Sequence, residues 1–384
     1  MRDKAHLRES DVIYNLCYEA RTASRDLARA DTAHINDTLY KIATNIRENK
    51  SYLLEENKRD LISAKSHRLR ESKIDRLTLN EKRIEAMATG CETVADLEDP
   101  FGEVLERWHQ DNGLEISRVT VPIGVLGMIY ESRPNVTIDA AVVALKSRNT
   151  IIMRGGSEIY YTASKLHDLI QNALQANEMP GGAVAMVPSR DRALVGRMLQ
   201  AHEKIDLLIP RGGRSLVERV MQEAYMPVLA HLDGLCHVYI HASADPELAR
   251  NIVFNAKMRR TGICGATETL LLDKNLDTGT CTRIIGDLLQ SGCEVCGDDE
   301  ARKLDTRITK ASEEDWRTEY LEAKISVKFV DDVNDAIAHI NYYGSHHTDS
   351  IICNDDEAKA LFYDRIDSAI VIHNASTQFA DGGE

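Results

Sequence analysis

Cys264 is the residue whose surroundings best suit a chemical reaction. It stands in a turn of small residues, and three cations, Lys257, Arg259 and Arg260, precede it. Small neighbours let a substrate approach the sulfur, and nearby positive charge favours the thiolate, which is the nucleophilic form of cysteine. A free cysteine can also be a small buried hydrophobic residue. The stretch therefore predicts a cysteine nucleophile, with buried packing as the alternative.

Two turns rich in glycine and arginine could bind an anion. They read Arg154-Gly155-Gly156-Ser157 and Arg211-Gly212-Gly213-Arg214, and each stands between an apolar run and a helix-like segment. Glycine lets the backbone approach a phosphate, a helix N-terminus favours an anion, and arginine binds phosphate oxygens. Neither turn matches GxGxxG or a P-loop. They are either a phosphate site or ordinary helix starts with solvated arginines.

Two further groups of possible ligands give weaker signals. Cys293 and Cys296 form a lone CxxC pair, whereas a zinc site normally needs four ligands. His346 and His347 could bind a metal or act as a general base, but no third ligand residue stands in register with them. A structural role is favoured for the histidines, and no metal site is predicted.

Composition limits the class of protein. The chain has 384 residues, eight cysteines and a net charge of −14. An acidic chain lacks the basic face that nucleic acid requires, and no apolar run approaches the roughly 20 residues that span a bilayer. The N-terminus lacks the apolar core of a signal peptide. We expect a globular, cytoplasmic protein with reduced cysteines, without a nucleic-acid or membrane partner.

Strands and helices alternate from residue 122 to about 230, as in a doubly wound, mostly parallel sheet. Strands are predicted at 124–130, 150–153, 183–187 and 205–209. Such sheets bind ligands beyond the carboxyl ends of their strands. Residues 1–108 have the apolar spacing of helices. Residues 109–121 alternate apolar and polar side chains, which suits a ribbon between domains or subunits, or a plain hairpin.

A second unit is predicted from residue 231. Its predicted strands are 236–240, 270–272 and 325–330, and its predicted helices are 245–258 and 335–342. Cys264 therefore falls in the turn between a helix and a strand. Residues 274–320 are polar and mixed, and no chemistry is assigned to them.

The sequence resembles the gamma-glutamyl phosphate reductase family, a branch of the aldehyde dehydrogenase superfamily, from about residue 12 to its end. The longest matching signature is Val330, Ala336-Ile337, His339-Ile340, Tyr343-Gly344-Ser345, His347-Thr348-Asp349 and Ile351. Further matches run from Pro122 to Thr137, from Arg154 to Glu158 and from Ile209 to Gly213. The resemblance implies an α/β, aldehyde-dehydrogenase-like fold. Its expected parts are a doubly wound NADPH-binding domain (1–108 and 122–230), a catalytic α/β domain (231–375) and a small connecting or oligomerisation ribbon (109–121).

The resemblance also implies a reaction. This is the NADPH-dependent reduction of L-glutamyl 5-phosphate to L-glutamate 5-semialdehyde and phosphate, the second step of proline biosynthesis. Cys264 would be the catalytic cysteine and would carry a thioester. As a hypothesis, the Asn135 side chain and the Cys264 backbone N–H would stabilise the oxyanion.

Other site residues follow from the same resemblance. The residues expected to bind the cofactor are Arg154, Gly155, Gly156, Ser157, Gly212, Gly213, Arg214 and Glu319. Glu319 falls where the superfamily has a glutamate that holds a cofactor ribose, with a solvated surface carboxylate as the alternative. Arg133, Arg211 and His347 are expected at the substrate. The sequence leaves open how the arginines divide between substrate and cofactor.

The chain departs from the superfamily in two respects that bear on function. The segment 231–236 lacks the glutamate that activates water in aldehyde dehydrogenases that make acids, which favours a thioester that is reduced. Asp233 is its only carboxylate. The family pattern continues with a Phe-Gly-Leu-Gly segment, so residues 376–384 are expected to be a truncated C-terminal segment.

Two other functions are kept as alternatives. One is an NAD(P)-dependent aldehyde dehydrogenase acting on another acid semialdehyde. The other is an inactive, truncated homologue that only binds cofactor or a partner. The resemblance further suggests a homo-oligomer and glutamate 5-kinase as a possible partner.

Overall fold

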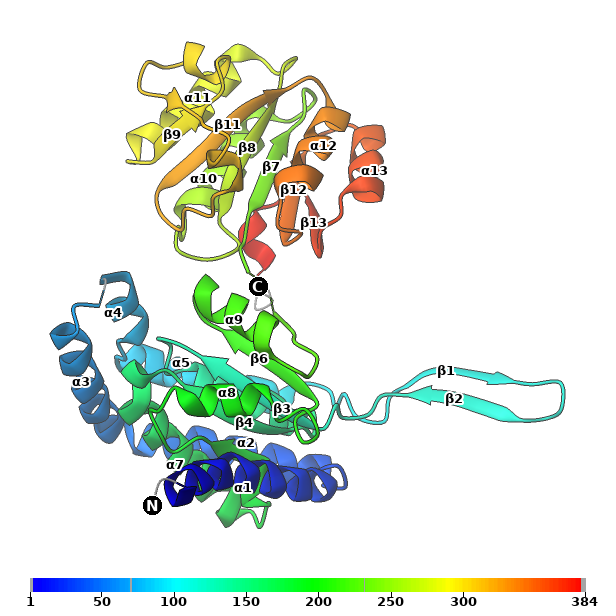
Figure 1. Cartoon of the computed structure of the whole chain (residues 1–384). Coiled ribbons are helices and arrows are strands. Elements are labelled where there is room, and N and C mark those ends of the chain that lie inside the picture. Colours follow the sequence, from blue (N-terminus) through cyan, green and yellow to red (C-terminus); the bar gives the residue numbers. More distant parts are fainter. Residues whose placement is uncertain (1–2, 70, 231, 381–384) are drawn as a thin grey trace. The chain divides into compact units, whose positions relative to one another are not determined.

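The computed structural model describes residues 3–69, 71–230 and 232–380. The chain divides into two compact units, Met1–Ala230 and His231–Glu384, hereafter unit 1 and unit 2 (Figure 1). Among the described helices, none is both long and apolar enough to cross a membrane.

Unit 1 contains a parallel four-stranded sheet. Its strands are β3 (Val125–Tyr130), β4 (Thr150–Gly155), β5 (Val184–Met186) and β6 (Leu207–Arg211), in the order β5-β4-β3-β6. These are the four strands predicted from the sequence. Their side chains are mostly buried because helices cover both faces of the sheet, as is usual for a parallel sheet.

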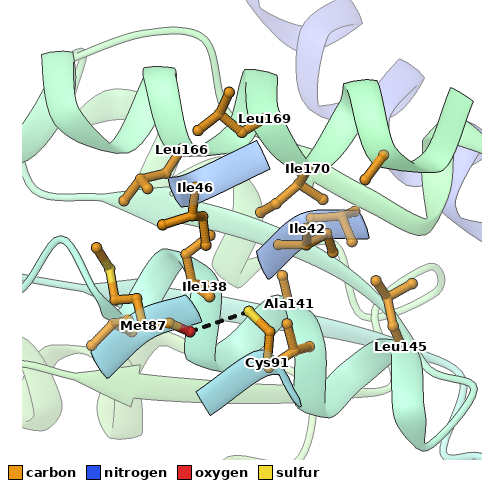
Figure 2. Close-up of a cluster of buried hydrophobic side chains, with 14 of the residues drawn as sticks. Ile42, Ile46, Met87, Cys91, Ile138, Ala141, Leu145, Leu166, Leu169 and Ile170 are labelled. Carbon is orange, nitrogen blue, oxygen red and sulfur yellow. Dashed lines mark hydrogen bonds between the residues drawn. The ribbon is translucent and has the colours of Figure 1, made fainter. Parts of the chain in front are cut away.

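Alternate strand residues face two separate hydrophobic cores. Ile151 and Met153 pack with helices α2, α3, α5, α6 and α7, whereas Ile152 packs with α1, α8 and α9. The helices are α1 (Asp3–Leu27), α2 (Thr32–Glu48), α3 (Lys50–Ser66), α4 (Glu71–Leu77), α5 (Glu81–Asp96), α6 (Val136–Lys146), α7 (Tyr160–Ala176), α8 (Ala193–Leu199) and α9 (Arg214–Glu223). Figure 2 shows the first core, in which Ile42 and Ile46 lie among the side chains of α6 and α7. The sheet is therefore doubly wound, as predicted.

The ribbon begins earlier than expected. Strand β1 (Val104–His109) pairs antiparallel with β2 (Glu115–Val119), so residues 104–108 are extended and not helical (Figure 1). The last helix before it, α5, ends at Asp96. Trp108 lies opposite Ile116, and such pairs of aromatic and β-branched residues stabilise an antiparallel ladder. The prediction that residues 1–108 are helical is therefore wrong for residues 104–108, which form most of strand β1.

Unit 2 contains a second, larger parallel sheet. Its strands are β7 (Cys236–Ile240), β8 (Thr267–Asp273), β9 (Glu294–Gly297), β10 (Thr309–Lys310), β11 (Lys324–Val330), β12 (Thr348–Ile352) and β13 (Ile370–His373), in the order β10-β9-β11-β8-β7-β12-β13. Helices α10 (Pro246–Met258) and α11 (Thr278–Gln290) pack on one face, and α12 (Val333–Tyr343) and α13 (Asp356–Arg365) on the other. The predicted α/β class is confirmed.

Local sequence explains the helix that leads to Cys264. The Asp245 carboxylate caps α10 by accepting a hydrogen bond of 2.8 Å from the Leu248 N–H, and Pro246 occupies its first turn. Residues 274–320, for which no element was predicted, include α11, β9 and β10. At the C-terminus, Thr377–Ala380 forms the short 3-10 helix η5. Residues 381–384 of the predicted truncated segment lie outside the described residues.

Candidate active site

Cys264 lies in the loop 259–266, hereafter the cysteine loop, between the end of α10 and the start of β8. It is half-buried, whereas the seven other cysteines are buried, and all eight are free thiols. The Thr377 hydroxyl donates to the Gly265 carbonyl at 2.7 Å, and the Ala266 N–H donates to the Ile263 carbonyl at 3.0 Å. The loop therefore has a defined backbone around the most accessible of the eight cysteines.

Gly234 packs directly against the nucleophile. A Cβ atom at this position would lie 2.2 Å from the Cys264 carbonyl oxygen and 2.7 Å from its Cα, closer than any side chain can approach. The Glu319 carboxylate accepts a hydrogen bond of 2.9 Å from the Gly234 N–H. Glu319 thus holds the segment against which the Cys264 backbone rests. This contact differs from the predicted one with a cofactor ribose, which stays a prediction.

Cys236 connects Cys264 with His347. The Cys236 Sγ–H donates to the Cys264 carbonyl at 3.1 Å, and the same sulfur lies 3.7 Å from His347 Nδ1. Burial raises the pKa of the Cys236 thiol well above its usual value, so the thiol remains a neutral donor. His347 is half-buried and directly precedes β12, which pairs with β7. A role of His347 at the substrate remains a prediction.

Lys257 has a different role from the one read in the sequence. Its ammonium forms an ion pair with Glu268 at 2.6 Å, and the two side chains are 0% and 1% exposed. Lys257 lies in the last turn of α10 and Glu268 is the second residue of β8, so the pair joins the segments on either side of the cysteine loop. Its charge is balanced by a carboxylate and is not reserved for the Cys264 thiolate.

Burial governs the protonation of this pair. It raises the pKa of Glu268 to about 7, although Lys257 acts in the opposite direction. The other Glu268 oxygen accepts a hydrogen bond of 3.2 Å from the Leu321 N–H. The carboxylate therefore joins three segments of unit 2: the end of α10, the start of β8 and the approach to β11.

The remaining predicted site residues lie in unit 1. Asn135 begins α6, and its amide donates to Asp139 at 2.7 Å. Arg133 is half-buried just before it. The structure thus gathers Cys264, Glu319 and His347 in unit 2 and holds the other predicted site residues separately in unit 1. The oxyanion role of Asn135 stays a prediction.

The first glycine-arginine turn stands at the end of β4. Arg154 is only 6% exposed, and it donates to the Gly155 carbonyl at 2.7 Å and to the Arg190 carbonyl at 3.1 Å. Burial lowers its pKa from the usual range. Gly156 precedes the short 3-10 helix η1 (Ser157–Ile159), and a Cβ there would lie 2.3 Å from a Glu158 carboxylate oxygen. Arg154 is therefore a buried part of the scaffold, and Ser157 is the exposed residue of the turn.

The second turn already binds an anion of the chain itself. The Gly213 N–H, at the start of α9, donates to the Glu131 carboxylate at 3.2 Å, and a Cβ at Gly212 would lie 2.9 Å from the same carboxylate. Arg214 forms an ion pair with Glu218 at 2.8 Å, and Arg211 is exposed at the end of β6. The glycines let the Glu131 carboxylate approach the backbone, and a phosphate at this turn stays a prediction.

A cavity of about 370 Å³ lies in unit 1. Ser157, Glu131 and Glu158 line it at the ends of β3 and β4, and Arg190 and Arg192 line it after β5. Sequence reasoning missed these two arginines, although Arg190-Asp191-Arg192 directly follows a predicted strand, where a parallel sheet binds its ligand. Within the described residues, no group of three or more metal-type ligands is gathered.

The aldehyde dehydrogenase family model matches residues 4–287. The gamma-glutamyl phosphate reductase of Zymomonas mobilis is 48% identical over 375 residues, which cover 98% of this chain and 88% of the relative. That of Brucella suis is 49% identical and covers 95% and 87%. This chain belongs to the gamma-glutamyl phosphate reductase branch of the aldehyde dehydrogenase family.

Solved structures agree with this assignment. The gamma-glutamyl phosphate reductase of Thermotoga maritima superimposes with a TM-score of 0.93 at 40% identity and covers 96% of this chain and 89% of its own. An acetylating aldehyde dehydrogenase from Geobacillus thermoglucosidasius, at 16% identity, gives a TM-score of 0.69 over 98% and 89% of the two chains and shares the fold. The predicted family and fold are confirmed, and enzymes of this family use NAD or NADP.

Proposed function

We propose that this chain reduces L-glutamyl 5-phosphate to L-glutamate 5-semialdehyde and phosphate, with NADPH as the reductant and Cys264 as the nucleophile. The names of its reductase relatives support the substrate. The structural observation that carries the proposal is the setting of Cys264, a half-buried thiol whose backbone is fixed by Gly234 and Cys236. A fixed backbone limits the positions that the sulfur can take, which lowers the entropic barrier to attack.

The chemistry begins with the thiolate of Cys264. It attacks the acyl carbon, the C–O bond to phosphate breaks, and the phosphate leaves with the electron pair, so that a thioester remains on the sulfur. The bound cofactor would supply a hydride to that thioester. When the resulting tetrahedral carbon collapses, the C–S bond breaks and the aldehyde leaves. The Cys264 N–H and the Asn135 amide are the proposed donors to the oxyanion.

The absence of a glutamate in 232–236 suits a thioester that must be reduced and not hydrolysed. Asp233 is the only carboxylate of this segment. The nearby Glu319 carboxylate accepts a hydrogen bond from the Gly234 N–H, so one of its oxygens is engaged with the backbone. We therefore favour phosphate release over a second attack by water.

Unit 1 offers a suitable place for the cofactor. Its cavity opens at the ends of β3 and β4 of a doubly wound sheet, which is where such sheets bind dinucleotides. The exposed Ser157 hydroxyl lies in its wall. We place the adenosine end of NADPH in this cavity.

We also propose a cytoplasmic homo-oligomer with glutamate 5-kinase as a transient partner. The ribbon of β1 and β2 supports the oligomer, because its exposed apolar residues include Val104, Leu105 and Trp108. Light scattering on the purified chain and on a Leu105→Asp/Trp108→Asp variant tests this. A smaller mass for the variant is expected, and equal masses would contradict a role for the ribbon.

The reaction is tested in the reverse direction. The full chain is incubated with glutamate 5-semialdehyde and NADP+, with and without phosphate, and NADPH formation is followed. We expect NADPH formation that requires phosphate. Equal rates without phosphate would instead support a hydrolytic aldehyde dehydrogenase, and cofactor binding without turnover would support the inactive homologue.

A further inference from the structure

The segment 376–378, far from Cys264 in the sequence, is polar in composition but buried in the fold. Its residues Ser376, Thr377 and Gln378 are all at most 3% exposed. Buried polar side chains normally have hydrogen-bond partners, because an unpaired one loses its bonds to water without replacement. The partners of segment 376–378 therefore show which part of the chain it holds.

Thr377 holds the side of the cysteine loop that leads into β8. Its hydroxyl donates to the Gly265 carbonyl at 2.7 Å, and it lies 2.9 Å from the Thr267 hydroxyl, which is the donor to it because Thr377 has only one proton to give. A Cβ at Gly265 would lie 3.1 Å from the Thr377 carbonyl oxygen, so the two backbones also lie close together. Gly265 directly follows Cys264. Thr377 therefore contacts the residue next to the nucleophile.

Gln378 holds the other side of the loop. Its amide nitrogen donates to the Ala256 carbonyl at 2.9 Å and to the Arg260 carbonyl at 3.3 Å. Ala256 lies in the last turn of α10, where backbone carbonyls lack partners within the helix, and Arg260 lies in the loop itself. The amide oxygen of Gln378 has no hydrogen-bond partner in the described part of the chain, so the two donated bonds orient the amide. Gln378 thus joins the end of α10 to the cysteine loop.

The residues just before this segment fasten it to the sheet of unit 2. The Asn374 side chain accepts a hydrogen bond of 3.0 Å from the Cys353 N–H and donates one of 3.1 Å to the Cys353 carbonyl. The Ser350 hydroxyl, in β12, donates to the Ala375 carbonyl at 2.8 Å. Segment 376–378 therefore fixes the cysteine loop relative to β12.

We propose that Thr377 and Gln378 are positioning residues for Cys264, because they hold both sides of the cysteine loop in the geometry that attack requires. This inference rests on the proposed function, in which Cys264 is the nucleophile. A displaced nucleophile reacts slowly even when it remains intact, since a shift of about 1 Å can cost about a hundredfold in rate. Both positioning side chains are buried and bond to backbone carbonyls of the loop and of α10, so they act through the backbone and not on the substrate.

Two variants remove these contacts and nearly preserve the shapes of the side chains. Thr377→Val lacks the hydroxyl, and Gln378→Met lacks the amide. Thr377→Ser keeps the hydroxyl and should behave like the parent chain. Thr269→Val is the matched control, because Thr269 is an equally buried threonine of β8 whose hydroxyl has no hydrogen-bond partner among the described residues.

Hydrogen–deuterium exchange on the full chain tests the hold on the loop without any turnover. Peptides that span the cysteine loop should exchange about three- to tenfold faster in Thr377→Val and in Gln378→Met, because each lost hydrogen bond makes local opening easier by about that factor. Peptides from α11, and all peptides of Thr269→Val, should exchange as in the parent chain. Unchanged exchange in the loop would overturn the inference, as would an equal increase throughout unit 2, which would indicate a general loss of stability.

Rapid-mixing kinetics test the effect on the reaction. The chain is mixed with glutamate 5-semialdehyde and NADP+ without phosphate, so that each chain forms one thioester and one NADPH. Thr377→Val and Gln378→Met should lower the rate of this burst by about tenfold or more and leave its amplitude unchanged, because every chain still reacts. Thr377→Ser should restore the rate.

The amplitude of the burst separates positioning from folding. A lower amplitude at an unchanged rate would overturn the inference, because it would mean that fewer chains are folded and that the folded ones react normally. A parent chain without any burst would instead refute the proposed reaction, and the exchange rates of the loop would then decide whether Thr377 and Gln378 hold it.

Discussion

Loss of either partner of the buried Lys257–Glu268 ion pair should destabilise unit 2, whereas replacement of both partners by apolar residues should not. Its two side chains are 0% and 1% exposed and are joined at 2.6 Å, so Lys257→Met leaves a carboxylate buried without its cation. Breaking one partner of such a pair costs about 3–5 kcal/mol. For units of this size that corresponds to a fall of roughly 6–20 °C in Tm.

The double variant Lys257→Met/Glu268→Leu should recover most of this loss, because apolar residues of similar volume often replace a buried ion pair without cost. A double-mutant cycle tests this: the free energy of unfolding in urea is measured for the parent chain, for both single variants and for the double variant. Lys303→Met is the control, because its pair with Glu300 is 65% and 53% exposed and should contribute less than about 1 kcal/mol. A loss below about 1 kcal/mol in Lys257→Met, or a double variant no more stable than the singles, would refute the reasoning.

Three further outcomes follow from contacts around the cysteine loop. Burial raises the pKa of Glu268 from 4.5 to about 7, so the folded chain binds this proton more tightly than the unfolded chain. The stability that Glu268 contributes through this proton is therefore complete below pH about 4.5 and is lost as the pH rises through 7. Urea titrations should show this slope in the parent chain and not in the Lys257→Met/Glu268→Leu variant, and equal slopes would contradict it. Gly234→Ala should abolish turnover, because the new Cβ would lie 2.2 Å from the Cys264 carbonyl oxygen, while Gly286→Ala, which meets no atom within 4 Å, should not. Activity retained by Gly234→Ala would mean that the loop can move aside. Glu319→Ala should lower kcat by about tenfold or more through loss of a charged hydrogen bond, and Glu319→Gln, which keeps an acceptor for the Gly234 N–H, should restore most of it. A raised KM for NADPH in both variants would instead support contact with the cofactor ribose.

Much of the fold could be predicted because its elements are local. Apolar runs such as 124–130 and 150–153 are buried parallel strands in the structure, and the helix-like spacing of Ile42 and Ile46 places both in the core of unit 1 (Figure 2). Segments of mixed polarity were less informative. Helix α11 was missed although Cys281, Ile284, Ile285 and Leu288 have helical spacing on its buried side, because polar residues fill the positions between them. All six residues of β1 are exposed, so no buried face gives that strand a regular apolar pattern.

The site was less predictable because its contacts join distant positions. Glu319 holds Gly234 across 85 residues of sequence, and Cys236 reaches Cys264 across 28. Residue type alone suggested that Lys257 favours the thiolate, and only the fold shows that Glu268 neutralises it. In the same way, glycine at 212 and 213 suggested a phosphate site, and only the fold shows that the Glu131 carboxylate lies against these glycines.

The central claim is that Cys264 carries the acyl group during turnover. The most direct measurement is intact-protein mass spectrometry of the chain after incubation with glutamate 5-semialdehyde and NADP+ in the absence of phosphate. We expect a glutamyl thioester on Cys264, discharged by added phosphate, absent from Cys264→Ala and unchanged in Cys281→Ala, whose buried thiol is the control. An adduct that persists in Cys264→Ala, or turnover that continues in that variant, would contradict the account.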